Sequence, residues 1–334
     1  MKYTKLGKTG ITVSRLCLGM MSFGNAQSWM LDLDEAKPIV NRALDAGINF
    51  YDTANVYSRG RCEEITGELL KDSRDDVVVA TKVRFAMGDG VNDFGLNKFH
   101  ISRQIDASLK RLKMDFVELY QIHRWDYNTD IEYIMRSLNK IIDDGKTLHI
   151  GASSMYAWEL AKAQYTAEKL GLEKFSTMQN HYNAMYREEE REIIPFCIDQ
   201  GMGIIPWSPL ARGFLSGKYK RDENINSVRY KTDPYLKSRY FRDNDFDIVE
   251  TVIEIAKEEN IFPAQVALTW VLSRSGITSP IIGVTNIDQL EQAIESTEIK
   301  LNIDAINRIN EAYSSRPIIG HSYNQPDNMV TVKK

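Results

Sequence analysis

The chain has 334 residues, of which 43% are hydrophobic, and its formal net charge is −4 at pH 7. The balance is mildly acidic and there is no basic stripe, so the sequence does not indicate a nucleic-acid-binding protein. The first residues lack the apolar core of a secretory signal and no apolar run reaches the about 18 residues of a membrane span, so we expect a cytoplasmic protein without a membrane partner.

Short runs rich in β-forming residues alternate with segments of helical period along the whole chain. A small hairpin is expected first, at residues 2–13, and helical segments at 263–274 and 303–314 stand apart from the alternation. The tail from Arg316 to Lys334 is expected to be a loop. The eight expected strand–helix units are 15–20 with 34–46, 48–53 with 62–71, 76–82 with 98–113, 116–123 with 131–145, 148–153 with 156–170, 175–180 with 188–199, 201–208 with 245–259, and 279–285 with 287–297.

Strands that alternate with helices imply a parallel sheet, and eight units favour a closed (βα)8 TIM barrel with an N-terminal β-hairpin and extra outer helices. The alternative is an open doubly wound sheet, but no G-x-G-x-x-G fingerprint follows the first strand. Composition does not change along the chain and no linker is visible. We therefore expect a single barrel domain over residues 1–334.

Active sites of such barrels lie at the carboxyl ends of the strands, so the last residues of each strand are the candidates. Taken one at a time, each candidate could instead be a cap, a turn residue or part of the core. Together they place polar and aromatic groups on one rim of an apolar barrel. In strand order these residues are Asp52, Lys82, His123, Ser153 with Ser154, Gln179, Trp207 with Ser208, and Gly283.

The stretch from Asp52 to Tyr57 suggests how this rim could act. A tyrosine has a pKa of about 10, and a nearby ammonium lowers it. If Lys82 lies beside Tyr57, with Asp52 orienting the lysine, the phenol can donate a proton to an oxygen that becomes an alkoxide. His123 could donate a hydrogen bond to the same oxygen. These residue types predict carbonyl–alcohol interconversion, for which a bound nicotinamide is the usual hydride source.

Other chemistries find less support in the sequence. No nucleophile–base pair is evident, and the three cysteines and five histidines show no metal-ligand spacing, so we expect no metal.

The chain resembles the aldo-keto reductase superfamily over nearly its whole length. The stretches that carry the resemblance stand in the family's order and are NFYDTANVY, VVVATKV, QIHRWD, IGASSM, MQNHYN, PWSPLARGFLSGKY and IIGVTNIDQLEQ. The resemblance implies a (βα)8 barrel that binds NAD(P)H in an extended pose. It also implies a catalytic tetrad of Asp52, Tyr57, Lys82 and His123, with Tyr57 as the general acid and His123 orienting the substrate carbonyl.

The same resemblance implies the cofactor contacts. NADPH is expected because the family prefers it, and NADH is the alternative, because Thr285 stands where NADPH-preferring members often have a cation. Arg212, Lys218 or Arg229 could meet the 2′-phosphate instead. The implied contacts are Ser153, Ser154, Gln179 and Trp207 at the nicotinamide, Ser208, Leu210, Arg212 and Lys218 at the pyrophosphate and ribose, and Gly283, Thr285, Gln289 and Gln292 at the adenosine.

The expected substrate is a small carbonyl compound: an aldehyde, a ketone or a sugar. Trp29 and Trp125 are candidates for the substrate pocket, although packing is an equally good interpretation. The basic insertion at 212–245, which includes Arg239, is either a solvated surface, a cofactor clamp or a site for an anionic substrate. Two other functions stay open: a cofactor-sensing binding subunit with little turnover, and a sugar-phosphate-converting enzyme. The sequence does not predict the oligomeric state.

Overall fold

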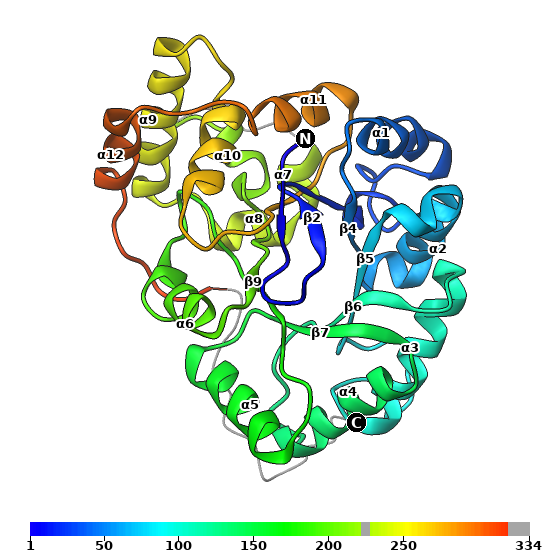
Figure 1. Cartoon of the computed structure of the whole chain (residues 1–334). Helices are drawn as coiled ribbons and strands as arrows, with labels where there is room; N and C mark the ends of the chain where they lie inside the picture. The colour runs from blue at the N-terminus through cyan, green and yellow to red at the C-terminus, as the bar shows by residue number, and fades with distance from the viewer. Residues whose placement is uncertain (222–227, 320–334) are drawn as a thin grey trace.

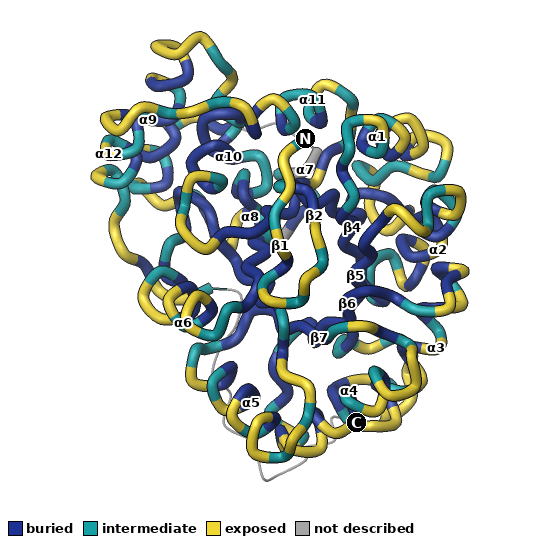
Figure 2. Tube along the Cα trace, viewed as in Figure 1, coloured by how far each residue is buried: buried dark blue, intermediate teal, exposed yellow. Residues whose placement is uncertain are grey.

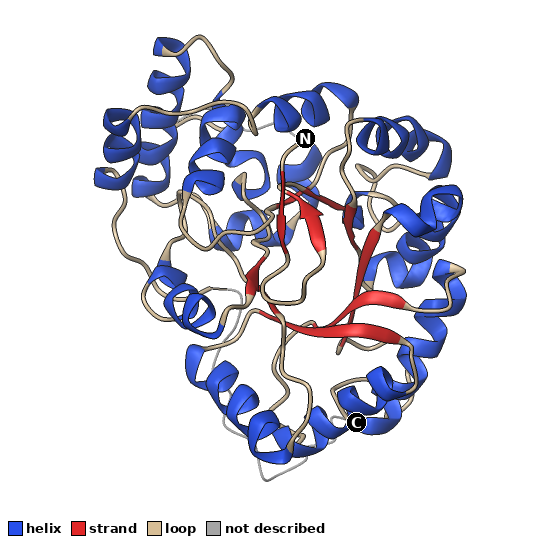
Figure 3. Ribbon diagram, viewed as in Figure 1, coloured by secondary structure: helices blue, strands red, loops and turns tan. Residues whose placement is uncertain are grey.

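The structure, a computed structural model, describes residues 1–221 and 228–319. Eight parallel strands form one sheet in the order β10-β3-β4-β5-β6-β7-β8-β9, and helices surround it (Figure 1, Figure 3). The sheet closes on itself because isolated bridges pair Ile204 with Ile277 and Trp207 with Ile281. The predicted (βα)8 barrel is confirmed. The strands are β3 (Cys17–Gly19), β4 (Phe50–Asp52), β5 (Val78–Val83), β6 (Val117–Ile122), β7 (Thr147–Ser153), β8 (Thr177–Gln179), β9 (Gly203–Ile204) and β10 (Ile281–Ile282).

The helices follow the predicted segments closely. No helix of the described residues is long and apolar enough to cross a membrane. The helices that follow strands are α1 (Leu33–Asp45), α2 (Arg61–Leu70), α3 (Lys98–Leu112), α4 (Ile131–Asp143), α5 (Ala157–Leu170), α6 (Ile193–Gln200), α9 (Asp243–Glu258) and α11 (Ile287–Glu295), with α10 (Pro263–Ser273) and α12 (Ile303–Glu311) as the two extra outer helices.

The predicted hairpin is also present. Strands β1 (Tyr3–Lys5) and β2 (Thr12–Ser14) pair in antiparallel fashion and lie across the barrel mouth that faces the viewer in Figure 3. Leu6 and Val13 of the hairpin are fully buried, and they pack with apolar residues at the beginnings of the barrel strands. The hairpin therefore covers the amino-terminal mouth of the barrel and leaves the carboxyl ends of the strands for the site.

The period of two along a strand decides which side chains enter the barrel. In β4, Phe50 belongs to the inner apolar cluster whereas Tyr51 packs against the outer helices, so the next residue, Asp52, faces inward again. The same alternation in β5 puts Val78 and Ala80 inside, and then Lys82. Figure 2 shows the barrel strands as largely buried, whereas the hairpin and the outer parts of the helices include many exposed residues. The inner faces are thus apolar near the hairpin and polar at the carboxyl ends.

Two features differ from the sequence-based prediction. Strands β9 and β10 span two residues each, fewer than the predicted segments 201–208 and 279–285. Pro206 and Pro280, which lie beside these strands, have no N–H to donate to a ladder. The insertion after β9 contains two short helices, α7 (Val228–Thr232) and α8 (Pro234–Arg239), which hydrophobic periodicity could not reveal because each spans fewer than two turns.

Candidate active site

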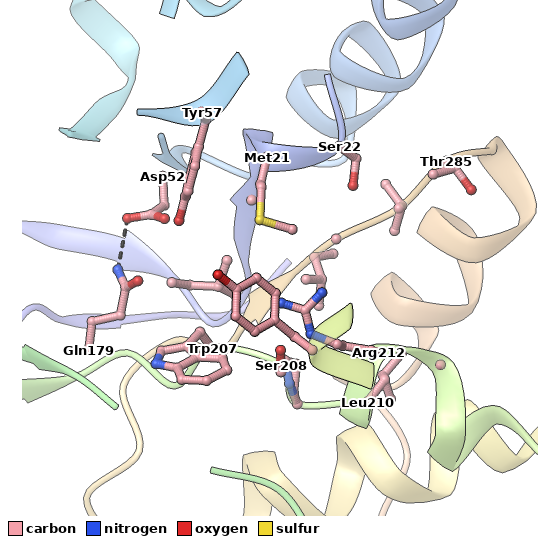
Figure 4. Close-up of a pocket in the computed structure, with 18 of the residues that line it drawn as sticks. Met21, Ser22, Asp52, Tyr57, Gln179, Trp207, Ser208, Leu210, Arg212 and Thr285 are labelled. Atoms are coloured by element: carbon pink, nitrogen blue, oxygen red, sulfur yellow. Dashed lines mark hydrogen bonds between the residues drawn. The ribbon is translucent and has the colours of Figure 1, made fainter. Parts of the chain in front are cut away.

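A large cavity lies at the carboxyl ends of the strands, with a volume of about 1210 Å³. Apart from Arg229, its lining includes the residues predicted to contact a cofactor, together with Trp29, Trp125 and three members of the predicted tetrad. Figure 4 shows Tyr57, Asp52 and Gln179 at one end, Leu210 and Arg212 further along, and Thr285 at the other end. The polar rim residues therefore converge on one elongated cavity, as the strand ends predict.

Lys82 and Asp52 form a buried ion pair at the base of this cavity. The Lys82 ammonium lies 2.5 Å from Asp52 Oδ2 and donates a second hydrogen bond, of 2.7 Å, to the carbonyl oxygen of Thr53. Burial by itself lowers the pKa of Lys82, but the Asp52 and Tyr57 charges outweigh it, so the pKa of Lys82 is raised. The lysine is therefore held as an ammonium although its side chain is completely shielded from solvent.

Tyr57 begins a short 3₁₀ turn, Tyr57–Gly60, which is separated from the end of β4 by residues 53–56. Ser58 and Arg59 of this turn have φ values of +48° and +51°, in the left-handed region that residues with a Cβ seldom adopt. The turn folds the phenol back over the strand end, where its oxygen lies 3.5 Å from the Lys82 ammonium. The predicted neighbourhood of Tyr57 and Lys82 is thus present in the structure.

The balance of effects on Tyr57 differs from the expectation. Burial raises the pKa of Tyr57, and the Lys82 charge lowers it by less, so the pKa lies above the ordinary value of 10.0. The sequence could not show this, because the extent of burial follows from tertiary packing. At neutral pH the phenol is a fully protonated donor, and the ammonium beside it stabilises the phenolate that a proton transfer would leave.

His123 follows β6 directly and lies edge-on to Tyr57, with their ring centres 5.7 Å apart. Burial, followed by the positive charges of Arg124, Lys82 and Arg84, lowers the pKa of His123 well below 6.5. The imidazole is therefore neutral at physiological pH and can donate one hydrogen bond from a ring nitrogen.

Gln179 is the last residue of β8, and its amide nitrogen donates a 2.8 Å hydrogen bond to Asp52 Oδ1 (Figure 4). Gln121, on the neighbouring strand β6, donates to the same oxygen at 3.1 Å. Each carboxylate oxygen of Asp52 therefore has donors of its own. Gln179 is engaged with the ion pair as well as facing the cavity.

Trp207 provides a flat surface beside these groups. The His181 ring stacks on the indole at 4.2 Å with an 8° angle between planes, and the indole nitrogen donates to Ser154 Oγ at 2.9 Å. Ser153 ends β7 and is buried in the same wall. The indole is thus fixed both by stacking and by a hydrogen bond.

The middle of the cavity is formed by the segment beyond β9. Ser208, Ala211 and Arg212 have φ values of +56°, +48° and +57°, so the backbone turns sharply here. Arg212 forms an ion pair with Asp233, the N-cap of α8. Lys218 and Leu210 line the same stretch. Arg229, named as a phosphate-binding candidate, has a side chain outside the described part of the structure.

At the far end, the chain enters α11 beside the cavity. Gln289 Oε1 accepts a hydrogen bond from the backbone N–H of Thr285 at 2.9 Å, and the Asn286 side chain caps the helix. Gly283 and Gln292 line the same wall.

Trp125 is buried against Trp158, with ring centres 6.3 Å apart, and it lines the cavity together with Trp29 near the Tyr57 end.

The sequence-based selection missed several lining residues. Arg84 and Phe85 follow β5 directly, and the Phe85 ring lies 4.8 Å from that of His123. Reading two residues further past each strand end would have found them. Tyr235 lines the cavity from α8 and Glu159 lines it from α5. No pattern in the sequence indicates that these two helices reach the cavity. Within residues 1–221 and 228–319, no three His, Cys, Asp or Glu side chains are grouped so as to hold a metal ion.

Comparisons with known proteins agree with this architecture. A model of the aldo/keto reductase family matches residues 15–314. The chain is 38% identical to the versiconal hemiacetal acetate reductase of Aspergillus parasiticus, over 95% of this chain and 98% of the relative. It is 35% identical to the aldo-keto reductase AMT2 of Alternaria alternata, over 96% and 94%, and 38% identical to the uncharacterized oxidoreductase YrpG of Bacillus subtilis, over 94% and 96%.

Proposed function

Since this chain belongs to the aldo/keto reductase family and is an oxidoreductase, we propose that it reduces the carbonyl group of an aldehyde, ketone or sugar with NAD(P)H, with Tyr57 as the proton donor. The observation that supports this most directly is the placement of the Tyr57 hydroxyl 3.5 Å from a buried ammonium, at one end of the large cavity. A cytoplasmic location and a small-molecule substrate are part of the same proposal.

The cavity lining fits an extended dinucleotide. Its volume of about 1210 Å³ is larger than that of most single-ligand pockets, which measure about 300–1,000 Å³. Trp207 offers an aromatic surface for a nicotinamide, and Ser153, Ser154 and Gln179 offer polar groups for its carboxamide. Arg212 and Lys218 supply positive charge for a pyrophosphate, and the wall at Thr285 and Gln289 would hold the adenosine. When bound, NAD(P)H supplies the hydride.

The protein side chains would donate the proton and orient the substrate carbonyl. Tyr57 Oη donates its proton to the carbonyl oxygen as negative charge develops there. The Lys82 ammonium stabilises the phenolate left behind, while Asp52 keeps the lysine charged and in position. Neutral His123 donates a hydrogen bond that orients the carbonyl. In each of these roles the side chain has the protonation state that its surroundings favour: Tyr57 is protonated, Lys82 is charged and His123 is neutral.

NADPH is the proposed cofactor, with NADH as the alternative. No lysine or arginine stands at position 285, where the Thr285 backbone and hydroxyl are both hydrogen-bonded to Gln289. A 2′-phosphate would therefore depend on cations elsewhere in the chain. Fluorescence-quenching titrations with NADPH and NADH measure the preference directly, without turnover.

The Tyr57→Phe variant tests the proposed proton donor. Replacing the hydroxyl by hydrogen should remove most turnover of a panel of aldehydes, about 10²–10⁴-fold for a general acid, while cofactor affinity stays unchanged. Loss of cofactor binding together with turnover would show a structural role for Tyr57. Tight cofactor binding by the unmodified chain without turnover of any carbonyl compound would instead favour a cofactor-sensing subunit.

A further inference from the structure

Three arginines from separate parts of the chain meet at the Tyr57 end of the cavity. Arg84 follows β5, Arg124 follows β6 beyond His123, and Arg239 ends α8; all three line the cavity. The Arg124 and Arg239 guanidinium groups lie 5.8 Å and 4.8 Å from the centre of the Trp207 ring. The arginines therefore surround the place where the proposed chemistry occurs.

Gathering these cations has an electrostatic cost. Burial lowers the pKa of Arg124 to about 10, and the positive charges of Arg239 and Arg84 also lower it, while Tyr57 acts in the opposite direction. Burial likewise lowers the pKa of Arg239, with the Arg212 charge adding to the effect. Like charges held together at a partly buried site repel each other unless a counter-charge is supplied.

Two of the three arginines have no carboxylate of the described residues as a direct partner, although the Asp233 charge acts on Arg239 less strongly than the Arg212 charge does. Neither Arg84 nor Arg239 is in ion-pair contact with a carboxylate of the described residues, and Arg84 Nε is buried without a hydrogen-bond partner. Arg212, which lines the same cavity, is in contrast paired with Asp233. The unneutralised charge is thus concentrated at the reactive end of the cavity.

The backbone conformation of Arg84 indicates that the surrounding structure holds this residue in place. Its φ is +151°, a value that residues with a Cβ rarely adopt, and its carbonyl oxygen accepts a 2.7 Å hydrogen bond from Gly95 N–H. Such strain persists only where the surrounding structure enforces it, and it clusters at ligand-binding positions. Arg124 is held as well, because it donates to the His123 carbonyl oxygen at 2.5 Å and to Ser153 Oγ at 3.3 Å.

The geometry points to an anion-recognition site, formed by Arg84, Arg124 and Arg239, that selects carbonyl substrates bearing a carboxylate or phosphate group. Guanidinium groups bind such oxygens with two parallel hydrogen bonds, which fixes orientation as well as affinity. Arg124 adjoins His123 in the chain, so the anionic group would lie within the length of a small molecule from the reacting carbonyl. This inference rests on the proposed function and names its substrate class.

The phosphates of the cofactor are the other anions that could meet these arginines. The residues proposed for the pyrophosphate, Arg212 and Lys218, belong to the segment after β9. Arg84 and Arg124 instead follow β5 and β6, on the wall that carries Tyr57 and His123. Arg239 belongs to the segment after β9, but its guanidinium lies 4.8 Å from the centre of the Trp207 ring, at the reactive end. The geometry therefore favours the substrate, and the experiment separates the two.

The test compares pairs of aldehydes in which one member carries an anionic group and the other does not. Initial rates of the full chain with saturating cofactor are measured for 4-formylbenzoate and its methyl ester, and for glyceraldehyde 3-phosphate and glyceraldehyde. We expect kcat/KM to favour the charged member of at least one pair by about 10- to 100-fold, as hydrogen bonds between charged groups allow. The pair that shows the preference identifies the anion as carboxylate or phosphate. Equal values within both pairs would overturn the inference.

Variants then locate the site. Arg239→Met and Arg84→Met should abolish the preference by raising KM for the charged compound, while KM for the neutral compound and the cofactor Kd from fluorescence titration stay unchanged. Arg239→Lys should retain part of the preference, because a lysine keeps the positive charge but cannot form the two parallel hydrogen bonds of a guanidinium group. Arg136→Gln is the matched control, because it removes one positive charge from the exposed face of α4. Weaker cofactor binding with equal slowing of both compounds would assign the arginines to the cofactor and contradict the proposal.

Failure of the proposed function gives a different result. If no carbonyl compound is turned over, the reductase proposal is refuted, and calorimetry of 4-formylbenzoate and its ester with the cofactor-saturated chain decides the anion site separately. Tighter binding of the acid that is lost in Arg239→Met would support the site. Equal binding of acid and ester would overturn it.

Discussion

The Lys82 ammonium lies 2.5 Å from a carboxylate oxygen of Asp52, with both side chains almost completely shielded from solvent. Removing one partner leaves an uncompensated buried charge, so Lys82→Met is expected to lower the free energy of unfolding by about 3–5 kcal/mol. The double variant Asp52→Asn/Lys82→Met should lose less than the sum of the two single variants, because the charges are removed together. Urea denaturation followed by circular dichroism measures all three; strictly additive losses would show that the pair is not coupled.

The pH dependence of reduction should report the pKa of Tyr57. Burial raises this pKa on balance, so the phenol stays protonated across the neutral range. We expect kcat for reduction to be constant between about pH 7 and 9 and to fall only above about pH 10. The measurement is a pH–rate profile at saturating substrate and cofactor. A decline centred near neutrality would contradict the assigned balance between burial and the Lys82 charge.

Folding stability should decrease in mild acid because of two buried histidines. Burial lowers the pKa of His123 and His181 well below 6.5, so the unfolded chain binds protons that the folded chain excludes. Below about pH 6.5 stability therefore falls with decreasing pH, by about 1.4 kcal/mol per pH unit for each histidine. In urea denaturation, His123→Asn should reduce the change in the free energy of unfolding by about 1.4 kcal/mol per pH unit. If the free energy of unfolding depends on pH in the same way for the variant and the unmodified chain, His123 takes up its proton in the folded state as readily as in the unfolded state.

The sequence predicted the barrel, and the positions of several residues on its rim, for a physical reason. Asp52 ends β4, Lys82 is the residue before the last one of β5, and His123 follows β6 directly. The period of two along a strand allows its inward face to be predicted without a structure. The same reasoning placed Ser153 and Gln179 on the rim. Where a functional side chain belongs to a regular strand end, local pattern and three-dimensional position are closely linked.

The remaining features depend on tertiary packing. Arg239 was predicted to belong to a solvated surface, a cofactor clamp or an anionic-substrate site, because nothing in the sequence shows that α8 folds back over the barrel end. The net direction of the Tyr57 pKa depends on burial, which no local pattern reports. Arg84 was passed over because it stands one residue beyond its strand. Pairing of distant segments, rather than local propensity, decides the outcomes for Arg239 and Tyr57, whereas Arg84 could have been found by reading further past its strand end.

Gly67 marks a close approach between helices α2 and α3. A Cβ added to Gly67 would lie 2.1 Å from the Leu112 carbonyl oxygen, which is backbone and cannot move aside cheaply. Gly67→Ala is therefore expected to lower the free energy of unfolding by about 1–3 kcal/mol, although alanine is the better helix former. Exposed Glu64→Ala on the same helix is the control, with a change within about 0.5 kcal/mol. A Gly67→Ala variant as stable as the unmodified chain would contradict the packing of α2 on α3.

Arg316 connects the tail to the helix that carries Arg239. Its guanidinium is buried, pairs with Asp245 at 2.8 Å, and donates hydrogen bonds to the carbonyl oxygens of Met185 and Arg239. Arg316→Met leaves the Asp245 carboxylate without its partner and the end of α8 without a donor. We expect a loss of about 3–5 kcal/mol in the free energy of unfolding.

The same variant should also disturb Arg239, because the bond to its carbonyl oxygen fixes the position from which the side chain reaches the cavity. KM for the charged substrate of the preferred pair should rise, whereas KM for its neutral counterpart should not. Asp245→Asn is the matched comparison: it breaks the ion pair but keeps the Arg316 bond to α8, so it should lower stability without altering the substrate preference. If both variants change the preference equally, the ion pair itself, rather than the bond to α8, positions Arg239.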